Sequence, residues 1–222
     1  MLRKLAFIAC LVFLFSPDST GQVAGEVEVL IAYPMYFNKK EVGITSDGFD
    51  YGFGFGGLYF NQESPIVAGI RFSHFSGKDT AIIDASDRNY QHIDLHGTAK
   101  LKFTSIVPQI GFKFVSEEHP LVTPGFTFGM GVSWARAEYD LPTYDSLTMH
   151  YFNPPWNMSG AFNEERKLVA IRPCMYLGFQ VYYEFRYFYA FGNLGLTYSM
   201  GEFPPSPVSL SAGAIIPLPG NY

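Results

Sequence analysis

The chain has 222 residues, of which 18% are aromatic and 16% are charged, and it contains 22 Gly. Soluble domains have fewer aromatic and more charged residues, yet after the N-terminal region no stretch reaches the ~18 consecutive apolar residues that a transmembrane helix needs. The formal net charge of −5 argues against a nucleic-acid partner, which requires a basic surface. A chain this apolar without a helical span fits the other structure that can cross a membrane, a closed β-barrel.

The N-terminal segment has the features of a secretory signal peptide. Arg3 and Lys4 supply positive charge, a short apolar core follows, and small residues precede an expected cleavage site after Gly21. The apolar core is too short to span a membrane as a helix. We therefore expect a signal peptide (1–21) and a single outer-membrane β-barrel domain (22–222).

Export and cysteine content limit the sites that the exported domain can contain. Cleavage leaves Cys174 as its single cysteine, so the sequence predicts neither an intramolecular disulfide nor a zinc site built on several cysteines. The signal peptide also contains Arg3, Lys4 and Asp18, which leaves 13 basic and 19 acidic residues and a net charge of −6. No motif indicates a metal ion or a cofactor, and none is expected.

An alternation of period two runs through most of the exported domain. In residues 122–134, large apolar residues occupy most even positions from Val122 to Trp134, while Thr, Gly and Ser occupy the odd positions. Successive side chains on a strand point to opposite faces, so each run has one large apolar face and one small or polar face. A barrel suits this pattern better than a soluble sandwich, because lipid contacts the large face and the narrow lumen takes the small one.

Eight such runs predict an all-β fold, a single closed antiparallel transmembrane β-barrel of about eight strands. An even number of strands places both ends of the domain on the periplasmic side, and the longest connection, 140–165, then lies outside the cell. The predicted strands are 26–37, 49–60, 65–76, 92–115, 121–139, 166–182, 186–199 and 207–218.

The fourth predicted strand, 92–115, contains a change of parity. Its large residues are odd-numbered up to Phe103, with Ala99 and Leu101 before it, and even-numbered from Ile110 onward. A hairpin at residues 106–108 would lack the Gly, Asn or Asp of a tight turn. We therefore expect a β-bulge there, which would reverse the facing of the strand and tolerate a proline.

Two residues could belong to a catalytic site. His74 and Ser76 share the parity of the lipid-facing residues near the outer rim, and a His-x-Ser pair at such a place resembles the outer-membrane lipid A deacylases. No Glu follows at the parity and distance needed to orient the histidine, as nucleophilic catalysis requires. We expect ordinary rim residues and no enzyme; an outer-leaflet lipid hydrolase is the alternative.

Charged residues on the inward parity predict what fills the lumen. Buried charges must be paired, and the interior of an eight-stranded barrel is just filled by side chains. We expect a network of ion pairs that closes the lumen; a narrow channel for small solutes is a further alternative. The predicted network consists of Glu26, Glu28, Arg71, Lys113, Arg172 and Glu184, with Lys100 and Lys102 farther out.

The connection 140–165 is rich in aromatic residues and poor in charge. Long loops on a rigid scaffold are where binding residues concentrate, and Tyr and Trp supply large, rigid contact area. A lid over the barrel mouth, or aromatic residues at the lipid interface, is the alternative role for this loop. The candidate binding residues are Tyr144, Tyr151, Phe152 and Trp156.

The order of these features resembles a known family. The start at Gln22, the eight alternating runs, the segment Phe-Thr-Ser-Ile-Val-Pro-Gln-Ile-Gly-Phe-Lys-Phe at 103–114 and the following Pro124-Gly125-Phe126 are similar to the small outer-membrane β-barrel (porin-like, PorT-type) proteins of Bacteroidota. The resemblance implies no shared catalytic residues, and one type in the family supports type IX secretion. We expect a structural or interaction role, with outer-membrane lipid and other outer-membrane proteins as partners.

Overall fold

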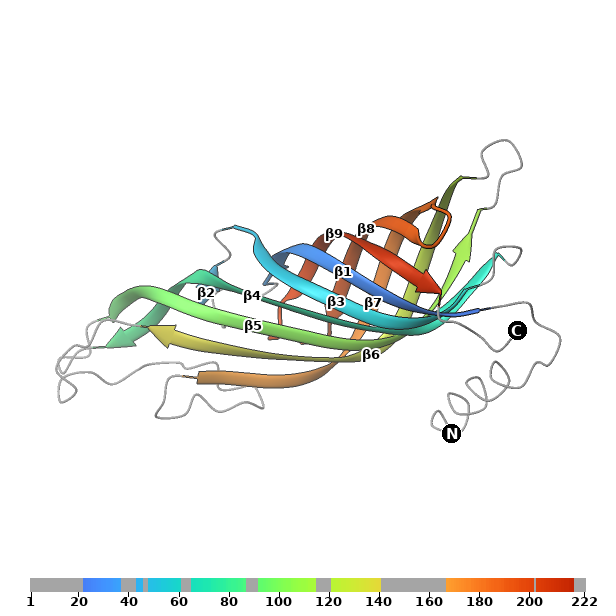
Figure 1. The fold of residues 1–222 in the computed structure, drawn as a ribbon. Helices are drawn as coiled ribbons and strands as arrows, with labels where there is room; N and C mark the ends of the chain where they lie inside the picture. Colours follow the sequence, from blue (N-terminus) through green and yellow to red (C-terminus); the bar gives the residue numbers. More distant parts are fainter. Residues whose placement is uncertain are drawn as a thin grey trace, which may run out of the picture.

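The computed structural model describes residues 22–36, 43–45, 48–60, 65–86, 92–114, 121–140, 167–201 and 203–217. No helix in these residues is long and apolar enough to cross a membrane. The described residues form nine strands (Figure 1), which are β1 (Gln22–Met35), β2 (Ile44–Thr45), β3 (Asp50–Phe60), β4 (Ile66–Ser86), β5 (His92–Lys113), β6 (Val122–Asp140), β7 (Lys167–Glu184), β8 (Tyr189–Ser199) and β9 (Ser206–Pro217).

Eight of these strands close into an antiparallel barrel. The strand order is β4-β3-β1-β9-β8-β7-β6-β5, and the pairing of β4 with β5 joins the two ends. The two-residue strand β2 is additional and pairs with β4 at Ala81 and Thr80. Ala24 near the start of β1 pairs with Pro217 at the end of β9, so both lie at one end of the barrel (Figure 1). The prediction of a closed barrel of eight strands is confirmed.

A broad belt of large apolar side chains covers the outside of the barrel. On β6 the belt runs from Val122 to Trp134, about 40 Å along the strand at ~3.4 Å per residue. A tilt of about 45° turns this into a height of about 30 Å, the thickness of a bilayer core. The outward large residues include Val27, Val29, Phe53, Phe55, Ile70, Ile106, Phe112, Phe128, Leu177, Phe179, Leu194 and Leu210.

Above the belt the same strands continue, but there the polar residues point outward and the apolar residues point inward. On β5 the outward residues change from Ile106 in the belt to the exposed Lys102 and Lys100, while the inward residues include the fully buried Leu101 and Phe103. The same change occurs on β4 and β6, where Lys78 and Arg136 point outward. We call this part of the sheet the outer extension; it comprises residues 76–86, 92–102, 136–140 and 167–170.

The expected β-bulge at 106–108 is therefore wrong. The pairing of β5 with β4 runs in one register from Ile66–Phe112 to Ser86–His92, so the facing of β5 never reverses. The large residues change parity because the surroundings of the strand change, with the outside in contact with lipid below and with water above. Ala99, Leu101 and Phe103 accordingly point inward, and Lys100 and Lys102, expected to point inward, are exposed.

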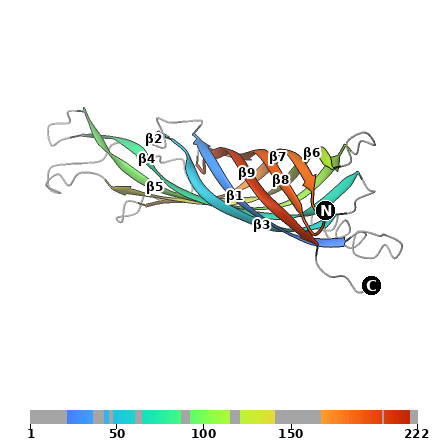
Figure 2. The same cartoon turned by 45° about the horizontal axis from the view of Figure 1, so that its top comes forward.

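An apolar core lies on the inner side of the outer extension. Strand β2 and the segment before β9 cover it, since Ile44 and Phe203 have no exposed surface. Figure 2 shows β4 and β5 projecting well beyond β1 and β9, with β2 beside them. The core also contains Tyr36, Phe75, Ala81, Ala99, Leu101, Phe103, Ala135, Ala137, Tyr139, Leu168 and Ala170. Apart from Ile82 and Val169, the described outward residues of the extension are polar. A sheet with a mainly polar outside and a covered apolar inside is the arrangement that water, and not lipid, stabilises.

A buried polar contact joins β1 to the outer extension. The hydroxyl group of Tyr36 donates a hydrogen bond of 2.9 Å to Oδ2 of Asp79 on β4. Asp50, the first residue of β3, is buried nearby, and burial together with the charge of Asp79 raises the pKa of Asp50 to about 7. The mouth of the barrel thus holds one carboxylate that is hydrogen-bonded and a second that gains a proton near neutral pH.

The belt makes a depth-dependent prediction for arginine substitutions. Phe128→Arg, Leu177→Arg and Ala212→Arg should each impair assembly, because an outward arginine near the middle of the bilayer costs about 2–4 kcal/mol, against about 0–1 kcal/mol near its surfaces. His96→Arg, also outward but above the belt, is the matched control and should assemble normally. Assembly is measured as the fraction that resists SDS at room temperature and shifts in the gel after boiling; equal tolerance at all four positions would contradict the placement of the belt.

Candidate functional site

An ion pair lies inside the barrel at the level of the belt. Nη2 of Arg71 on β4 lies 2.6 Å from Oε1 of Glu28 on β1 and donates a hydrogen bond of 2.7 Å to its Oε2. The two side chains are 4% and 0% exposed. Charge-assisted, two-point contacts of this kind are the strong ones, and they offset part of the cost of removing both charges from water.

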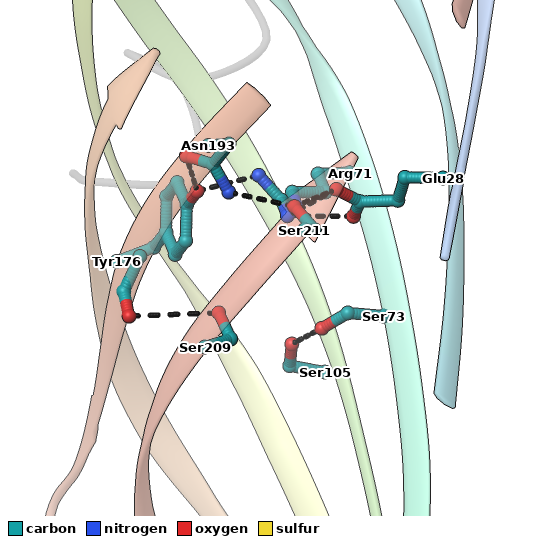
Figure 3. Close-up of polar contacts among 9 residues, drawn as sticks. Glu28, Arg71, Ser73, Ser105, Tyr176, Asn193, Ser209 and Ser211 are labelled. Carbon is teal, nitrogen blue, oxygen red and sulfur yellow. Dashed lines mark hydrogen bonds and ion pairs between the residues drawn. The ribbon is translucent and has the colours of Figure 1, made fainter. Parts of the chain in front are cut away.

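The ion pair is part of a closed ring of hydrogen bonds across the lumen (Figure 3). Nη1 of Arg71 donates to the hydroxyl of Tyr176 on β7, which donates to Oδ1 of Asn193 on β8 at 3.0 Å. Nδ2 of Asn193 donates to Ser211 on β9 at 3.1 Å, and Ser211 donates to Oε2 of Glu28 at 2.6 Å. With the Asn193 amide turned over, its nitrogen donates to the hydroxyl of Tyr176 and its oxygen accepts from Arg71, so Asn193 stays joined to both residues.

Glycines on the inward faces make room for this ring. A Cβ atom at Gly178 would lie 2.4 Å from the hydroxyl of Tyr176, and one at Gly195, its partner across β7 and β8, would lie 2.9 Å from the same ring. A Cβ at Gly54 would lie 2.2 Å from Oε1 of Glu28. The small inward parity of the sequence therefore accommodates a few large polar side chains, and it does not mark an open channel.

The other charges predicted for the lumen lie at different levels. Glu26 is 2% exposed, has no hydrogen-bond partner for either carboxylate oxygen, and interacts electrostatically with Arg71. Lys113 is buried and is attracted to Glu184. Arg172 lies apart from the ring, beside Gly201 and within 3.4 Å of the carbonyl oxygen of Ile171. The structure thus brings Glu26, Glu28 and Arg71 together.

Three residues of the ring were not among the predicted site residues. Tyr176, Asn193 and Ser211 lie on inward parities that were recognisable in the sequence. Asn193 is flanked by Gly192 and is followed by Gly195, and a lone amide among small residues on a lumen face was the available signal. What the sequence lacks is the register that places β1, β4, β7, β8 and β9 at one height.

Both candidate catalytic residues lie on the outer surface of β4. His74 is hydrogen-bonded through Nδ1 to the hydroxyl of Thr104 at 2.8 Å, and its ring packs against Phe53. Ser76 is exposed and pairs with Tyr51 on β3 and Lys102 on β5. A serine nucleophile needs a histidine that a third group orients as a base, and the partner that the structure gives His74 is a neutral hydroxyl.

The remaining candidates are not part of the described structure. Tyr144, Tyr151, Phe152 and Trp156 fall within 141–166, outside the described residues. Within the described ranges, no group of three or more His, Cys, Asp or Glu side chains is placed to hold a metal ion. Cys174 is buried, with a free thiol.

Comparison with known proteins shows the fold. No family model and no curated protein matches the sequence. Ail, the attachment invasion locus protein of Yersinia pestis, solved in complex with the heparin analogue sucrose octasulfate, is 11% identical with a TM-score of 0.51, over 90% of this chain and 100% of that one. Neisserial surface protein A is 10% identical with a TM-score of 0.53, over 88% and 97% of the two chains. Both comparisons cover nearly the whole barrel.

The ring predicts a specific pattern of stability losses. Arg71→Met should destabilise the barrel by about 3–5 kcal/mol, because it leaves Glu28 buried without its counter-charge. The double substitution Glu28→Gln with Arg71→Met should recover most of this loss, and Arg186→Met at an exposed turn should change stability by less than about 0.5 kcal/mol. Urea unfolding in phospholipid vesicles, followed by tryptophan fluorescence, measures these three variants and the single variant Glu28→Gln. A double variant as unstable as the sum of its two single variants would show that Glu28 and Arg71 act independently.

Proposed function

We propose that this protein is an outer-membrane β-barrel with a structural or interaction role, which holds its outer extension and loops at the cell surface. The observation that carries the proposal is the change in outward residues at one level on three neighbouring strands. Below this level the outward residues are Phe72, Ile106 and Val132, and above it they are Ser76, Lys102 and Arg136. Lipid below and water above is the environment that suits this change.

The interior argues for an interaction role over transport. The ring of Glu28, Arg71, Tyr176, Asn193 and Ser211 joins five strands through the middle of the lumen. In a barrel of eight strands such side chains fill the space that a solute would need. A channel function would require the ring to open, at the cost of leaving its charges unpaired.

The direction of the extension follows from the lengths of the connections between strands. In outer-membrane barrels the short turns lie in the periplasm and the long connections lie outside. Here the short turn between β7 and β8 lies at the end opposite to the outer extension (Figure 1). We therefore assign the outer extension to the extracellular side, where Tyr144, Tyr151, Phe152 and Trp156 of the long connection are its candidate contact residues.

The finer role follows from the resemblance of the sequence to PorT-type barrels. On that basis we propose that the protein serves as an accessory of a secretion or uptake machine and contacts other outer-membrane proteins through its loops. A lipid hydrolase is a weaker candidate, because His74 is oriented by a hydroxyl and not by a carboxylate.

Surface display is tested by cysteine labelling in intact cells. In a Cys174→Ala background, Lys102→Cys should react with a membrane-impermeant maleimide, because its side chain is exposed on the outer extension. Arg186→Cys, exposed in the turn between β7 and β8, should react only after the cells are broken. The reverse order of labelling would show that the outer extension faces the periplasm. Labelling of neither site in intact cells would contradict the placement of the protein in the outer membrane.

The contact role is tested by a loop replacement. Exchanging residues 146–160 for a Gly/Ser linker should leave the gel shift on boiling unchanged, because the described strands are intact, and should abolish cross-linking to outer-membrane proteins. The control exchanges residues 61–64, which connect β3 to β4 in the sequence, for a linker of the same length. Cross-links that persist after the 146–160 exchange would place the contact surface elsewhere.

A further inference from the structure

A cluster of cations covers the outward face of the outer extension. We call it the basic face; it consists of Lys78 on β4, Lys100 and Lys102 on β5, Arg136 on β6 and Lys167 on β7. The first four are exposed. In the two outward rows next to the belt, the face holds five of the 13 basic residues that follow Gly21 and one of the 19 acidic residues, Glu138. Asp140 and the paired positions Asp84 and Asp94 have the same parity and lie farther from the belt. A chain that is acidic as a whole is therefore basic in these two rows.

The register of the sheet places like charges opposite each other. Lys78 pairs with Lys100, and Lys102 pairs with Arg136. Side chains directly opposite on one face have their Cβ atoms about 5 Å apart, and like charges there destabilise a sheet. Glu138 lies opposite Lys100 and Lys167 and forms an ion pair with Arg136 in which the side chains are 46% and 40% exposed. Lys78 and Lys102 still have like charges directly across the strands. Bound anions would relieve this repulsion.

The basic face lies directly above the apolar belt. Lys102 and Arg136 form the outward row next to Thr104 and Trp134, and below these follow Ile106 and Val132. Aromatic residues such as Trp134 mark the level of the membrane surface. Lysine side chains extend their apolar stems along such a surface and hold the ammonium group at the headgroup level.

We propose that the basic face binds the phosphate groups of phosphorylated lipid in the leaflet that surrounds the outer extension. This inference rests on the proposed function, since it needs the barrel in an outer membrane. The cations point sideways from the wall of the barrel, toward adjacent lipid, and they continue the lipid-contacting belt without a gap. Both features favour a lipid over a soluble polyanion approaching from above.

The test compares lipid A that carries two phosphates with its one-phosphate form. Binding to the purified, folded barrel in detergent is measured by native mass spectrometry and by fluorescence of labelled lipid. We expect the parent to prefer the two-phosphate form, with binding that weakens as salt increases. The triple variant K78Q/K100Q/K102Q should bind it at least tenfold more weakly, since each cation near a lipid surface contributes several-fold to affinity.

Two controls and a second ligand make the result decisive. K78R/K100R/K102R, which keeps the charge, should bind like the parent, and R186Q, which removes a cation at the opposite rim, should also bind like the parent. A triple variant with parental affinity overturns the proposal, as does lysine-dependent binding of heparin without binding of lipid A. The gel shift on boiling is measured for every protein: its absence in the parent counts against the barrel itself, whereas a normal shift with lysine-independent binding counts against this site alone.

Discussion

The pairing of β4 with β5 is the constraint on which the rest of the structure depends. Inside a bilayer each backbone N–H and C=O group must find its partner within the protein, and this pair joins the two edges that the other strands leave open. Its register continues without interruption from Ile66–Phe112 to Ser86–His92. The same hydrogen bonds therefore close the barrel, help to bring Arg71 to the level of Tyr176 on β7, and support the outer extension above the membrane.

Alternation in the sequence was sufficient to predict the closed barrel, and it failed where the solvent changes. The runs predicted eight strands because large residues recur at period two where lipid surrounds the sheet. Strand β4 was predicted to end at Ser76 and ends at Ser86, because above the belt large residues no longer mark the outward face. For the same reason Leu101 and Phe103 were assigned to lipid and lie in a core. Alternation in the sequence shows that the two faces of a strand differ, but it does not show which face points out of the barrel.

The sequence predicted that charged residues would pair inside the lumen, but it did not predict the hydrogen-bonded ring that they belong to. Parity alone places Glu28 and Arg71 on inward faces, and the cost of an unpaired buried charge predicts that they meet. The ring through Tyr176, Asn193 and Ser211 depends on the stagger between strands around the barrel, since it joins β1 to β9, which lie at opposite ends of the sequence. Stagger is a property of all eight pairings together, and no single run of the sequence contains it.

The apolar core beneath the basic face fixes the strand register that places its lysines opposite like charges. A weakly held sheet could separate Lys78 from Lys100 by slipping one residue, because a slip turns every side chain to the other face. Here that slip would turn Leu101 and Phe103 out into water and break the apolar core beneath them. Burial of each such side chain contributes about 1.5–3 kcal/mol, more than the roughly 0.2–1 kcal/mol at stake in a cross-strand pair. The register therefore holds, and the repulsion between the lysines is left for anions at the membrane surface to relieve.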